Sequence, residues 1–156
     1  METAYIKTPL GIAKIIGDEK GISEISALDE GIVSDIIPSV LQKSAAQLLD
    51  YFQGTRTDFS FKLNPKGTDF QQKVWQELLN IPYGKTISYM DLSKKIGDVK
   101  AIRAVASANG KNPLWIVVPC HRVIGADGSL VGYAGGLWRK KWLLEHENPT
   151  NQQSLF

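Results

Sequence analysis

The sequence predicts an α+β chain: a small N-terminal α/β layer followed by a mostly helical C-terminal domain that contains a helix-turn-helix pair. Before residue 64 the apolar pattern indicates strands around one helix, and after "NPKG" (64–67) it indicates short helices. With 43% apolar and 22% charged residues among 156, the chain can bury a core. We expect an N-terminal domain over 1–65, a second domain over 66–148 and a flexible tail over 149–156.

The first domain is predicted to contain a hairpin and one helix. "IAKII" and "GISEISAL" flank the turn-like "GDEKG", which is typical of two antiparallel strands. The next stretch, "PSVLQKSAAQLLDYFQG", has Pro38 near its start and Gly54 just past its end, as helices prefer. Its apolar positions share one helical face: Leu41, Ala45, Leu48, Leu49 and Phe52. "TDFSFKL" alternates and predicts a further strand, and we expect no chemistry in this domain.

The second domain begins with a sequence of helix signals. Thr68 and Gln71 form a capping-box pattern at the start of "TDFQQKVWQELLNIPYG". Ser88 then caps "SYMDLSKKIG", which Gly97 ends. "DVKAIRAVASANG" follows at once as a helix from Asp98 to residues 109–110. Two short helices joined by a tight turn that contains glycine form a helix-turn-helix pattern.

One face of the second helix of this pair combines cations with small side chains. Lys100, Arg103, Ala104 and Ser107 fall at i, i+3, i+4 and i+7 and so lie together. Small side chains let a helix backbone approach a surface such as a DNA groove closely. An ordinary solvent-exposed face is the alternative.

The distribution of charge favours an anionic partner for the second domain. Residues 1–65 carry 6 Lys+Arg against 9 Asp+Glu, a net charge of −3, and residues 66–156 carry 12 against 7, a net charge of +5. The two parts sum to the +2 of the whole chain. Nucleic acid is the usual partner of such a basic region. The alternative is that the difference in charge between the two parts arises by chance.

Composition also excludes several classes of protein. No apolar run approaches the ~20 residues that span a bilayer, and no signal-peptide pattern is visible at the N-terminus. A single cysteine forms no internal disulfide, so we expect a reducing, cytoplasmic location. One Cys and two His, His121 and His146, are too few for a four-ligand Cys/His zinc site, so we expect no metal.

The lone cysteine lies in "IVVPCHRVIG", where we expect a buried strand to end at Pro119 and to present Cys120. A base and a cation, His121 and Arg122, follow directly, and such neighbours lower the pKa of a thiol. Successive strand residues point to opposite faces, so contact between Cys120 and His121 needs a turn or a bridging water. A buried cysteine that acts as a small apolar side chain is the alternative.

The last part of the chain, "GYAGGLWRKKWLLEHE", predicts a glycine-rich loop around Tyr133 followed by a helix. We expect an amphipathic helix in which Leu137, Trp138, Lys141, Trp142 and Glu145 wrap two faces. Glu147 near its end either reaches back towards the thiol or is a surface carboxylate, and its spacing alone favours the surface.

Taken in order, "FQQKVW", "ISY", "IRAVASANGKNP", "PCHRVIG", "GYAGG" and "RKKWLLEHE" resemble the O6-alkylguanine-DNA alkyltransferase family, and most closely its bacterial methylated-DNA–protein-cysteine methyltransferases. The resemblance covers residues 68–147 almost continuously. The first 65 residues match only in general shape and length. It implies a ribonuclease H-like N-terminal layer and a winged-helix-like second domain.

The resemblance also implies a reaction. The protein flips an O6-alkylguanine, or an O4-alkylthymine, out of double-stranded DNA and takes the alkyl group onto Cys120 in a single turnover. His121 acts as the base through a water, and Glu147 orients His121. Asn112 braces the loop beneath the site. No cofactor is implied, because the alkylated base brings its own electrophile.

Further roles follow from the same resemblance. Tyr89 assists the leaving guanine and turns the DNA phosphate, and Arg103 fills the gap left by the flipped base. The remaining DNA contacts are assigned to Lys100, Ala104, Ser107 and Arg122, and the base pocket to Tyr133, Ala134, Gly135 and Trp115. Ala134 and Trp115 depart from relatives that have a serine and a proline at those positions.

Three other interpretations compete with repair. A non-catalytic sensor of alkyl lesions and a winged-helix DNA-binding module would both bind DNA without transfer, and a Cys–His hydrolase would turn over many times.

The tail raises a separate hypothesis, because "QQSLF", Gln152–Phe156, resembles the short peptide by which bacterial repair proteins dock on the replication sliding clamp. We expect a monomer in solution.

Overall fold

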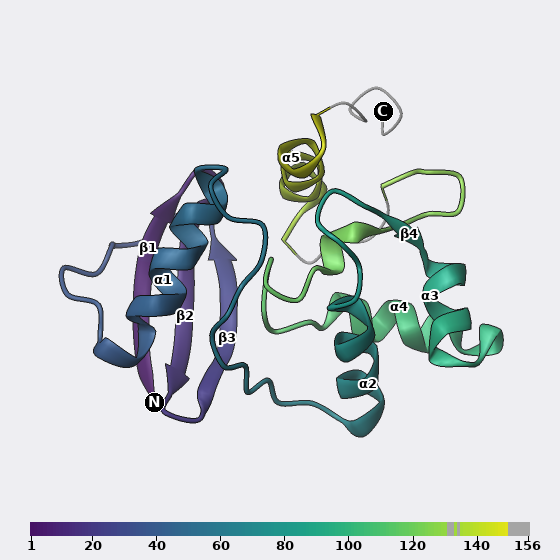
Figure 1. The fold of residues 1–156 in the computed structure, drawn as a ribbon, viewed down its shortest axis with the longest axis horizontal. Coiled ribbons are helices and arrows are strands. Elements are labelled where there is room, and N and C mark those ends of the chain that lie inside the picture. The colour runs from purple at the N-terminus through teal and green to yellow at the C-terminus, as the bar shows by residue number, and fades with distance from the viewer. Residues whose placement is uncertain (131–132, 134, 150–156) are drawn as a thin grey trace. The chain divides into compact units, whose positions relative to one another are not determined.

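The computed structural model describes residues 1–130, 133 and 135–149, and the chain divides into two compact units (Figure 1). Unit 1 contains residues 1–66 together with 113–117. Unit 2 contains residues 67–112 and those from Val118 onward. Among the described residues, no helix has both the length and the apolar character needed to cross a membrane.

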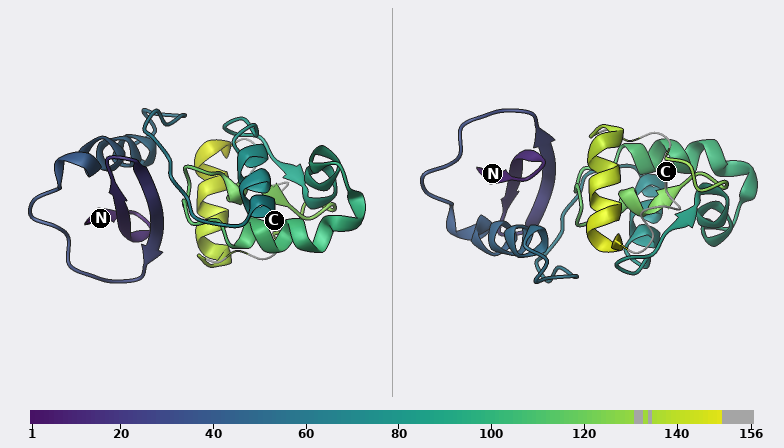
Figure 2. Two further views of the ribbon diagram at one scale, coloured as in Figure 1. Left: turned by 90° about the horizontal axis from the view of Figure 1, so that it is seen from below. Right: turned by 90° about the horizontal axis from the view of Figure 1, so that it is seen from above.

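Unit 1 is a three-stranded antiparallel sheet with one helix packed on it. Its elements are β1 (Glu2–Thr8), β2 (Gly11–Asp18), β3 (Gly21–Leu28) and α1 (Ser39–Phe52). The strands pair in the order β1-β2-β3, and α1 lies against one face, over β1 and β2 (Figures 1 and 2). Leu41, Leu48 and Ile15 are among the fully buried side chains between the two layers. This apolar contact holds the unit together.

The predicted hairpin and helix of unit 1 are confirmed. β2 pairs with β3 through the turn at residues 19–20, with Ile15 opposite Ile25. Pro38 is the residue before α1, and Gly54 follows the helix with a φ of 83°. Leu49, which the helical spacing placed on the apolar face, is instead 37% exposed.

The strand predicted over "TDFSFKL" is wrong, because side-chain contacts hold this segment rather than a ladder. Leu63 makes only an isolated bridge to Ile22. The Ser60 backbone N–H and hydroxyl bond the Gln47 side chain of α1 at 2.9 and 2.8 Å. The Phe59 ring packs on Tyr51 at 5.8 Å between centroids. Anchors on a helix leave no continuous row of backbone groups for the sheet.

Unit 2 is mostly helical. Its helices are α2 (Asp69–Leu78), α3 (Tyr89–Ile96), α4 (Ile102–Gly110) and α5 (Leu137–Glu147), with 3-10 turns η1 (Val99–Ala101) and η2 (Cys120–Arg122) and a short parallel pairing of β4 (Ile87–Ser88) with β5 (Val123–Ile124). In both views of Figure 2 the yellow α5 lies beside the green segment that contains η2, which it contacts. Val74, Leu78, Leu92 and Val105 are fully buried among the helices.

The predicted caps of unit 2 are confirmed. The Thr68 hydroxyl accepts from the Gln71 N–H at 3.1 Å, and the Gln71 side chain accepts from the Thr68 N–H at 2.9 Å. Ser88 caps α3, and Gly97 ends it in the left-handed conformation with a φ of 108°. The next helix does not run unbroken from Asp98, because the Asp98 carboxylate bonds the Lys100 N–H and tightens the first turn into η1.

Two expectations near the cysteine are wrong. Residues 113–119 form no strand: Leu114 makes one isolated bridge to Ile25, and Ile116 has a φ of 72°, which turns the chain away from the sheet. Cys120 therefore opens the turn η2 rather than ending a strand.

The predicted helix is confirmed as α5, but its pattern differs, because it buries two cations beside Leu143 and Leu144 and exposes the apolar side chains at its start. Leu137 and Trp138 are about half exposed, while Arg139 and Lys140 are buried. The buried cations have backbone partners: Arg139 donates to the Gly135 carbonyl at 2.8 Å, and Lys140 donates to the Val123 carbonyl at 2.7 Å. Hydrogen bonds of this kind offset the cost of burying charge.

Candidate active site around Cys120

Cys120 is buried at the start of η2, and two asparagines hold the backbone around it. The Val118 carbonyl accepts from the Cys120 N–H at 2.8 Å and from the Asn112 amide at 2.7 Å. The Asn109 amide approaches the Cys120 carbonyl at 3.5 Å. Because both asparagines come from the end of α4 or just after it, that helix fixes the position of the cysteine.

The thiol is buried, and polar neighbours oppose the effect of that burial. Burial raises the pKa of Cys120, whereas a hydrogen bond from Asn112, the charge of Lys140 and a hydrogen bond from Tyr133 lower it. Burial outweighs these groups, so the pKa of the Cys120 thiol lies above its usual range. The polar neighbours nevertheless distinguish this thiol from one in an apolar site.

His121 and Arg122 share a single carboxylate, that of Glu147 at the end of α5. The His121 Nε2 lies 2.7 Å from Glu147 Oε2. Arg122 donates to both Glu147 oxygens, from Nε at 2.8 Å and from Nη2 at 3.0 Å, and its Nη1 donates to the Ile81 carbonyl at 2.7 Å. All three side chains are buried, so the surface location considered for Glu147 is wrong.

The charges of this cluster follow from its contacts. Burial raises the pKa of Glu147, but the hydrogen bonds from His121 and Arg122 and the charge of Arg122 outweigh it and hold the carboxyl pKa well below its usual range. Burial lowers the pKa of His121, although Glu147 opposes this shift. We therefore assign a neutral imidazole beside an ionised carboxylate that Arg122 neutralises.

This assignment fixes which imidazole nitrogen can act as a base. An ionised carboxylate only accepts hydrogen bonds, so the His121 Nε2 carries the proton that it donates to Glu147. The lone pair is then on Nδ1, which has no hydrogen-bond partner among the residues that the structure describes. The cluster can receive a proton at Nδ1.

A buried lysine completes the site, and sequence reasoning missed it. Lys140 is fully buried, and its Nζ lies 5.9 Å from the ring centre of Tyr89 and 6.0 Å from that of Tyr133. In the run "WRKKW" it looks like a surface cation. Its spacing of i, i+4 and i+7 with Leu144 and Glu147 is the signal that could have found it.

The structure separates the residues assigned to DNA contact. Lys100, Arg103, Ala104 and Ser107 are all exposed on η1 and α4, on one surface. Arg122 is buried, and Glu147, Ile81 and the Tyr83 ring take its contacts, the ring centre at 5.7 Å. The assignment of Arg122 to DNA contact is therefore corrected: its donors are committed inside unit 2.

The residues assigned to the base pocket also separate. Tyr133 and Gly135 lie before α5, and Ala134 lies outside the described residues, as do Gln152–Phe156. Trp115 belongs to unit 1, where its ring packs 6.1 Å from that of Phe52. Its assignment to the pocket is corrected, because the ring is part of the core of unit 1.

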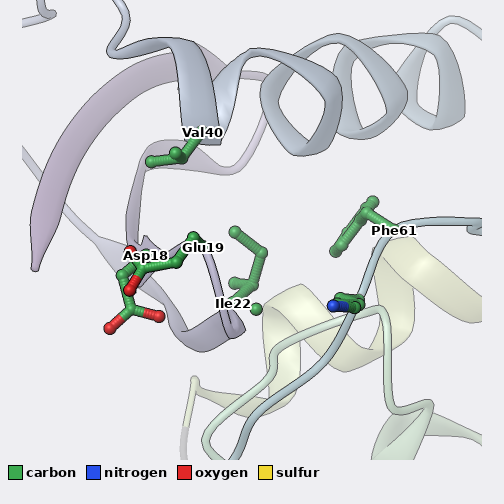
Figure 3. A pocket seen from close by; sticks show the side chains of 7 residues that line it. Asp18, Glu19, Ile22, Val40 and Phe61 are labelled. Carbon is green, nitrogen blue, oxygen red and sulfur yellow. The ribbon is translucent and has the colours of Figure 1, made fainter.

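Elsewhere the described residues offer little chemistry. No group of three or more His, Cys, Asp or Glu among them could hold a metal ion. A pocket of about 230 Å³ in unit 1 has an apolar lining of Ile22, Val40 and Phe61, with Asp18 and Glu19 at its edge (Figure 3). No cysteine, serine, threonine or histidine lines it, so Cys120 and its neighbours are the candidate active site.

Comparison with known proteins assigns both units. Residues 69–149 match the family described as "6-O-methylguanine DNA methyltransferase, DNA binding domain", and residues 1–65 match its "ribonuclease-like domain". A methylated-DNA–protein-cysteine methyltransferase of Methanosarcina barkeri is 44% identical over 148 residues, which cover 91% of this chain and 94% of that protein.

Solved structures agree with these matches. The crystal structure of the Mycobacterium tuberculosis O6-methylguanine methyltransferase has a TM-score of 0.85 and 42% identity, and the match covers 95% of this chain and 93% of that one. The structure of Mycobacterium tuberculosis OGT in complex with DNA has a TM-score of 0.87 and 41% identity, with coverage of 100% and 99%.

Proposed function

The chain belongs to the 6-O-methylguanine DNA methyltransferase family, and from this premise we propose that Cys120 is the residue that accepts the methyl group. The protein is a methylated-DNA–protein-cysteine methyltransferase that repairs O6-methylguanine in DNA. One observation carries the assignment of Cys120. The only cysteine of the chain is buried directly before the His121–Glu147 pair, whose 2.7 Å contact leaves Nδ1 as a base.

The chemistry requires a thiolate and a protonated leaving group. The thiol proton passes through a water to His121 Nδ1, while Glu147 and Arg122 hold the ring in place. The sulfur attacks the methyl carbon in line, the S–C bond forms and the C–O bond breaks, and its electron pair goes to the guanine O6. The Tyr89 hydroxyl gives a proton to the departing guanine, which leaves neutral, and the proton held on His121 replaces it through water. The product is a thioether, which has no route back, so each protein acts once and needs no cofactor.

The surface of α4 is suited to opening the duplex. Flipping a base costs a few kcal/mol, least for a damaged base that pairs badly. Arg103, exposed beside the small side chains of Ala104 and Ser107, enters the stack where the base was, and Lys100 meets phosphate. The opposite side of the same helix places Asn109 at the Cys120 carbonyl. A single element thus connects the DNA surface with the thiol.

The proposal also covers the domain bounds, the base pocket, the oligomeric state and the location of the protein. Residues 1–65 form the N-terminal domain, and 66–148 form the DNA-binding and catalytic domain except for 113–117, which pack in the first. Residues 149–156 are a tail. Tyr133 and Gly135 form the lid of the base pocket, which accepts O6-alkylguanine and O4-alkylthymine. The protein acts as a monomer in the cytoplasm, where a reducing environment keeps its single thiol free.

Intact mass after incubation with duplex DNA that contains one O6-methylguanine tests the function. The expected result is one gain of about 14 Da per protein, mapped to Cys120, because one methyl group replaces one hydrogen on a single sulfur. Cys120→Ser should bind the lesion and gain nothing. Tight binding by the natural chain without a gain of mass would instead indicate a lesion sensor, and repeated turnover would refute single use.

The tail supports a second, separable proposal. Gln152–Phe156 resembles a peptide that docks on the replication sliding clamp. Deleting residues 152–156 should abolish binding to purified clamp and leave methyl transfer unchanged, with a scrambled tail as the matched control. Equal binding of the full chain and the deletion variant, or no binding of either at high micromolar concentration, would refute it.

A further inference from the structure

Lys140 is a buried charged group that the methyl transfer described so far does not use. Its side chain is fully buried, although an ammonium group normally stays in water. Burial lowers its pKa from 10.5 to about 8, and the negative charge of Cys120 acts in the opposite direction. At neutral pH the group is therefore still mostly charged, inside the protein.

Three contacts from three segments fix the position of this cation. The Val123 carbonyl of β5 accepts from its Nζ at 2.7 Å. The rings of Tyr89, at the start of α3, and of Tyr133 lie 5.9 and 6.0 Å from it and present faces that attract cations. Val123 is three residues after Cys120, so the carbonyl that holds the ammonium belongs to the same turn and strand that position the thiol.

We propose that Lys140 is the counter-charge of the Cys120 thiolate: a fixed buried cation that stabilises the sulfur anion as it forms. The inference rests on the proposed role of Cys120. A thiolate in a buried site lacks water to stabilise it, and a nearby cation acts strongly where the dielectric constant is low. His121 is neutral before the transfer and gains a charge only by taking the thiol proton, whereas Lys140 carries its charge beforehand.

The ionisable groups around Lys140 define the pH range of a test. The charge of Lys140 acts on Cys120 and His121 of η2, and its Nζ lies over the rings of Tyr89 of α3 and Tyr133 before α5. Tyr89 stays neutral near pH 7, since burial raises its pKa above the ordinary 10.0. Lys140 loses its own charge above about pH 8. The stabilising effect is therefore expected below that pH.

Thiol alkylation by iodoacetamide tests the proposal without DNA. Between pH 6 and 8, Lys140→Met should react about tenfold more slowly than the natural chain, which corresponds to one unit in the pKa of the thiol. Lys140→Arg keeps a cation and should restore most of the rate. Lys141→Met removes the same charge at the next, exposed position of α5 and should change nothing.

The outcomes are distinct. Equal rates for Lys140→Met and the natural chain would overturn the proposal, as would a loss in Lys140→Arg as large as in Lys140→Met. A natural chain that takes no methyl group from DNA, but whose thiol still responds to Lys140, would refute the proposed function alone.

A reciprocal measurement decides the matter even where Lys140→Met fails to fold. If the cation stabilises the thiolate, the thiolate must raise the pKa of Lys140 by the same coupling. NMR titration of the Lys140 Cε signal should therefore give a lower pKa in Cys120→Ser than in the natural chain. The same pKa in both proteins would overturn the proposal.

Discussion

The two units bury different kinds of polar residue. In unit 1 the buried polar side chains are all uncharged: Thr8, Ser23, Ser44 and Gln47. Every buried charged or imidazole side chain of the described residues lies in unit 2: His121, Arg122, Arg139, Lys140 and Glu147. Hydrophobic burial and local hydrogen bonds account for unit 1, whereas unit 2 must also hold charge away from water.

The buried charges of unit 2 serve the reaction of the protein rather than its stability. Buried ion pairs seldom add stability over apolar residues of similar size, and breaking one leaves a charge without compensation. The charged cluster of unit 2 is therefore poorly explained as a device for folding. It is well explained by a thiol that must ionise out of water. Substitutions in the two units should accordingly fail in different ways.

The largest effect is expected for Glu147→Gln, which should lower both the free energy of unfolding and the rate of methyl transfer. The amide leaves Arg122 buried without its anion, at a cost of about 3–5 kcal/mol in the free energy of unfolding. It also removes the group that orients His121, so methyl transfer should fall steeply. Chemical denaturation and the rate of mass gain measure the two losses, and unchanged values of either would contradict this account of the cluster.

The same carboxylate predicts an acid dependence. The pKa of Glu147 is lower in the folded chain than its ordinary 4.5, so its contribution to stability is full above that pH and declines as the pH falls below it. In Glu147→Gln the midpoint of urea unfolding should change less between pH 6 and pH 3.5. An equal acid dependence in both proteins would show that other carboxyl groups are responsible.

Leu48→Ala sharpens the contrast from the side of unit 1. Leu48 is fully buried on α1 against the sheet, so its truncation should cost about 2–5 kcal/mol through lost burial and a cavity. The thiol should be unaffected, and the folded protein should transfer one methyl group at the natural rate. Exposed Leu49→Ala is the matched control and should change stability little. A slower methyl transfer in fully folded Leu48→Ala would show that unit 1 also affects the reaction.

Arg103→Ala should give the opposite result, a loss of chemistry without a loss of stability. The side chain is exposed on α4, so the unfolding midpoint should not move. The flipped base loses the group that fills its gap, and transfer from duplex DNA should slow about tenfold, which corresponds to 1.4 kcal/mol. Transfer from free O6-methylguanine base, which needs no flipping, should not change. Equal slowing with both substrates would place Arg103 in the chemistry instead.

The smallest effect is expected for Thr68→Ala. The hydroxyl satisfies the Gln71 N–H at the start of α2, and loss of such a cap costs about 1 kcal/mol. The change should lower the melting temperature by a few degrees and leave thiol reactivity unchanged. Thr68→Ser, which keeps the hydroxyl, should be close to the natural chain. A loss in Thr68→Ser equal to that in Thr68→Ala would rule out the cap as the cause.

Local signals in the sequence predicted most of the fold. The hairpin, α1 and the caps of α2 and α3 depend on residues within a few positions of one another, and all were found. The strand expected at residues 57–63 failed because its Ser60 is held by Gln47, 13 positions away on another element. Alternation describes which residues are apolar and does not reveal which backbone is available to pair.

The residues of the site likewise divide into those that the sequence predicted and those whose positions depend on distant parts of the chain. The family motif pointed to Cys120, His121 and Glu147, and the last two do meet. The buried positions of Arg122 and Lys140 depend on the carbonyls of Ile81 and Val123, which are 41 and 17 residues away. Charged residue types alone predict a surface location. Their burial is decided by acceptors that only the folded chain brings together.

The short segment at residues 113–117 has a consequence for how such proteins can be altered by recombination. It belongs to unit 1, where the Ile25 N–H donates to the Pro113 carbonyl and the Trp115 N–H donates to the Ile25 carbonyl, yet the chain on either side of it belongs to unit 2. A single crossover between residues 66 and 67 would therefore take the sheet of unit 1 from one parent and residues 113–117, which pair with that sheet, from the other. Homologous halves should recombine well only when residues 113–117 are inherited with the first.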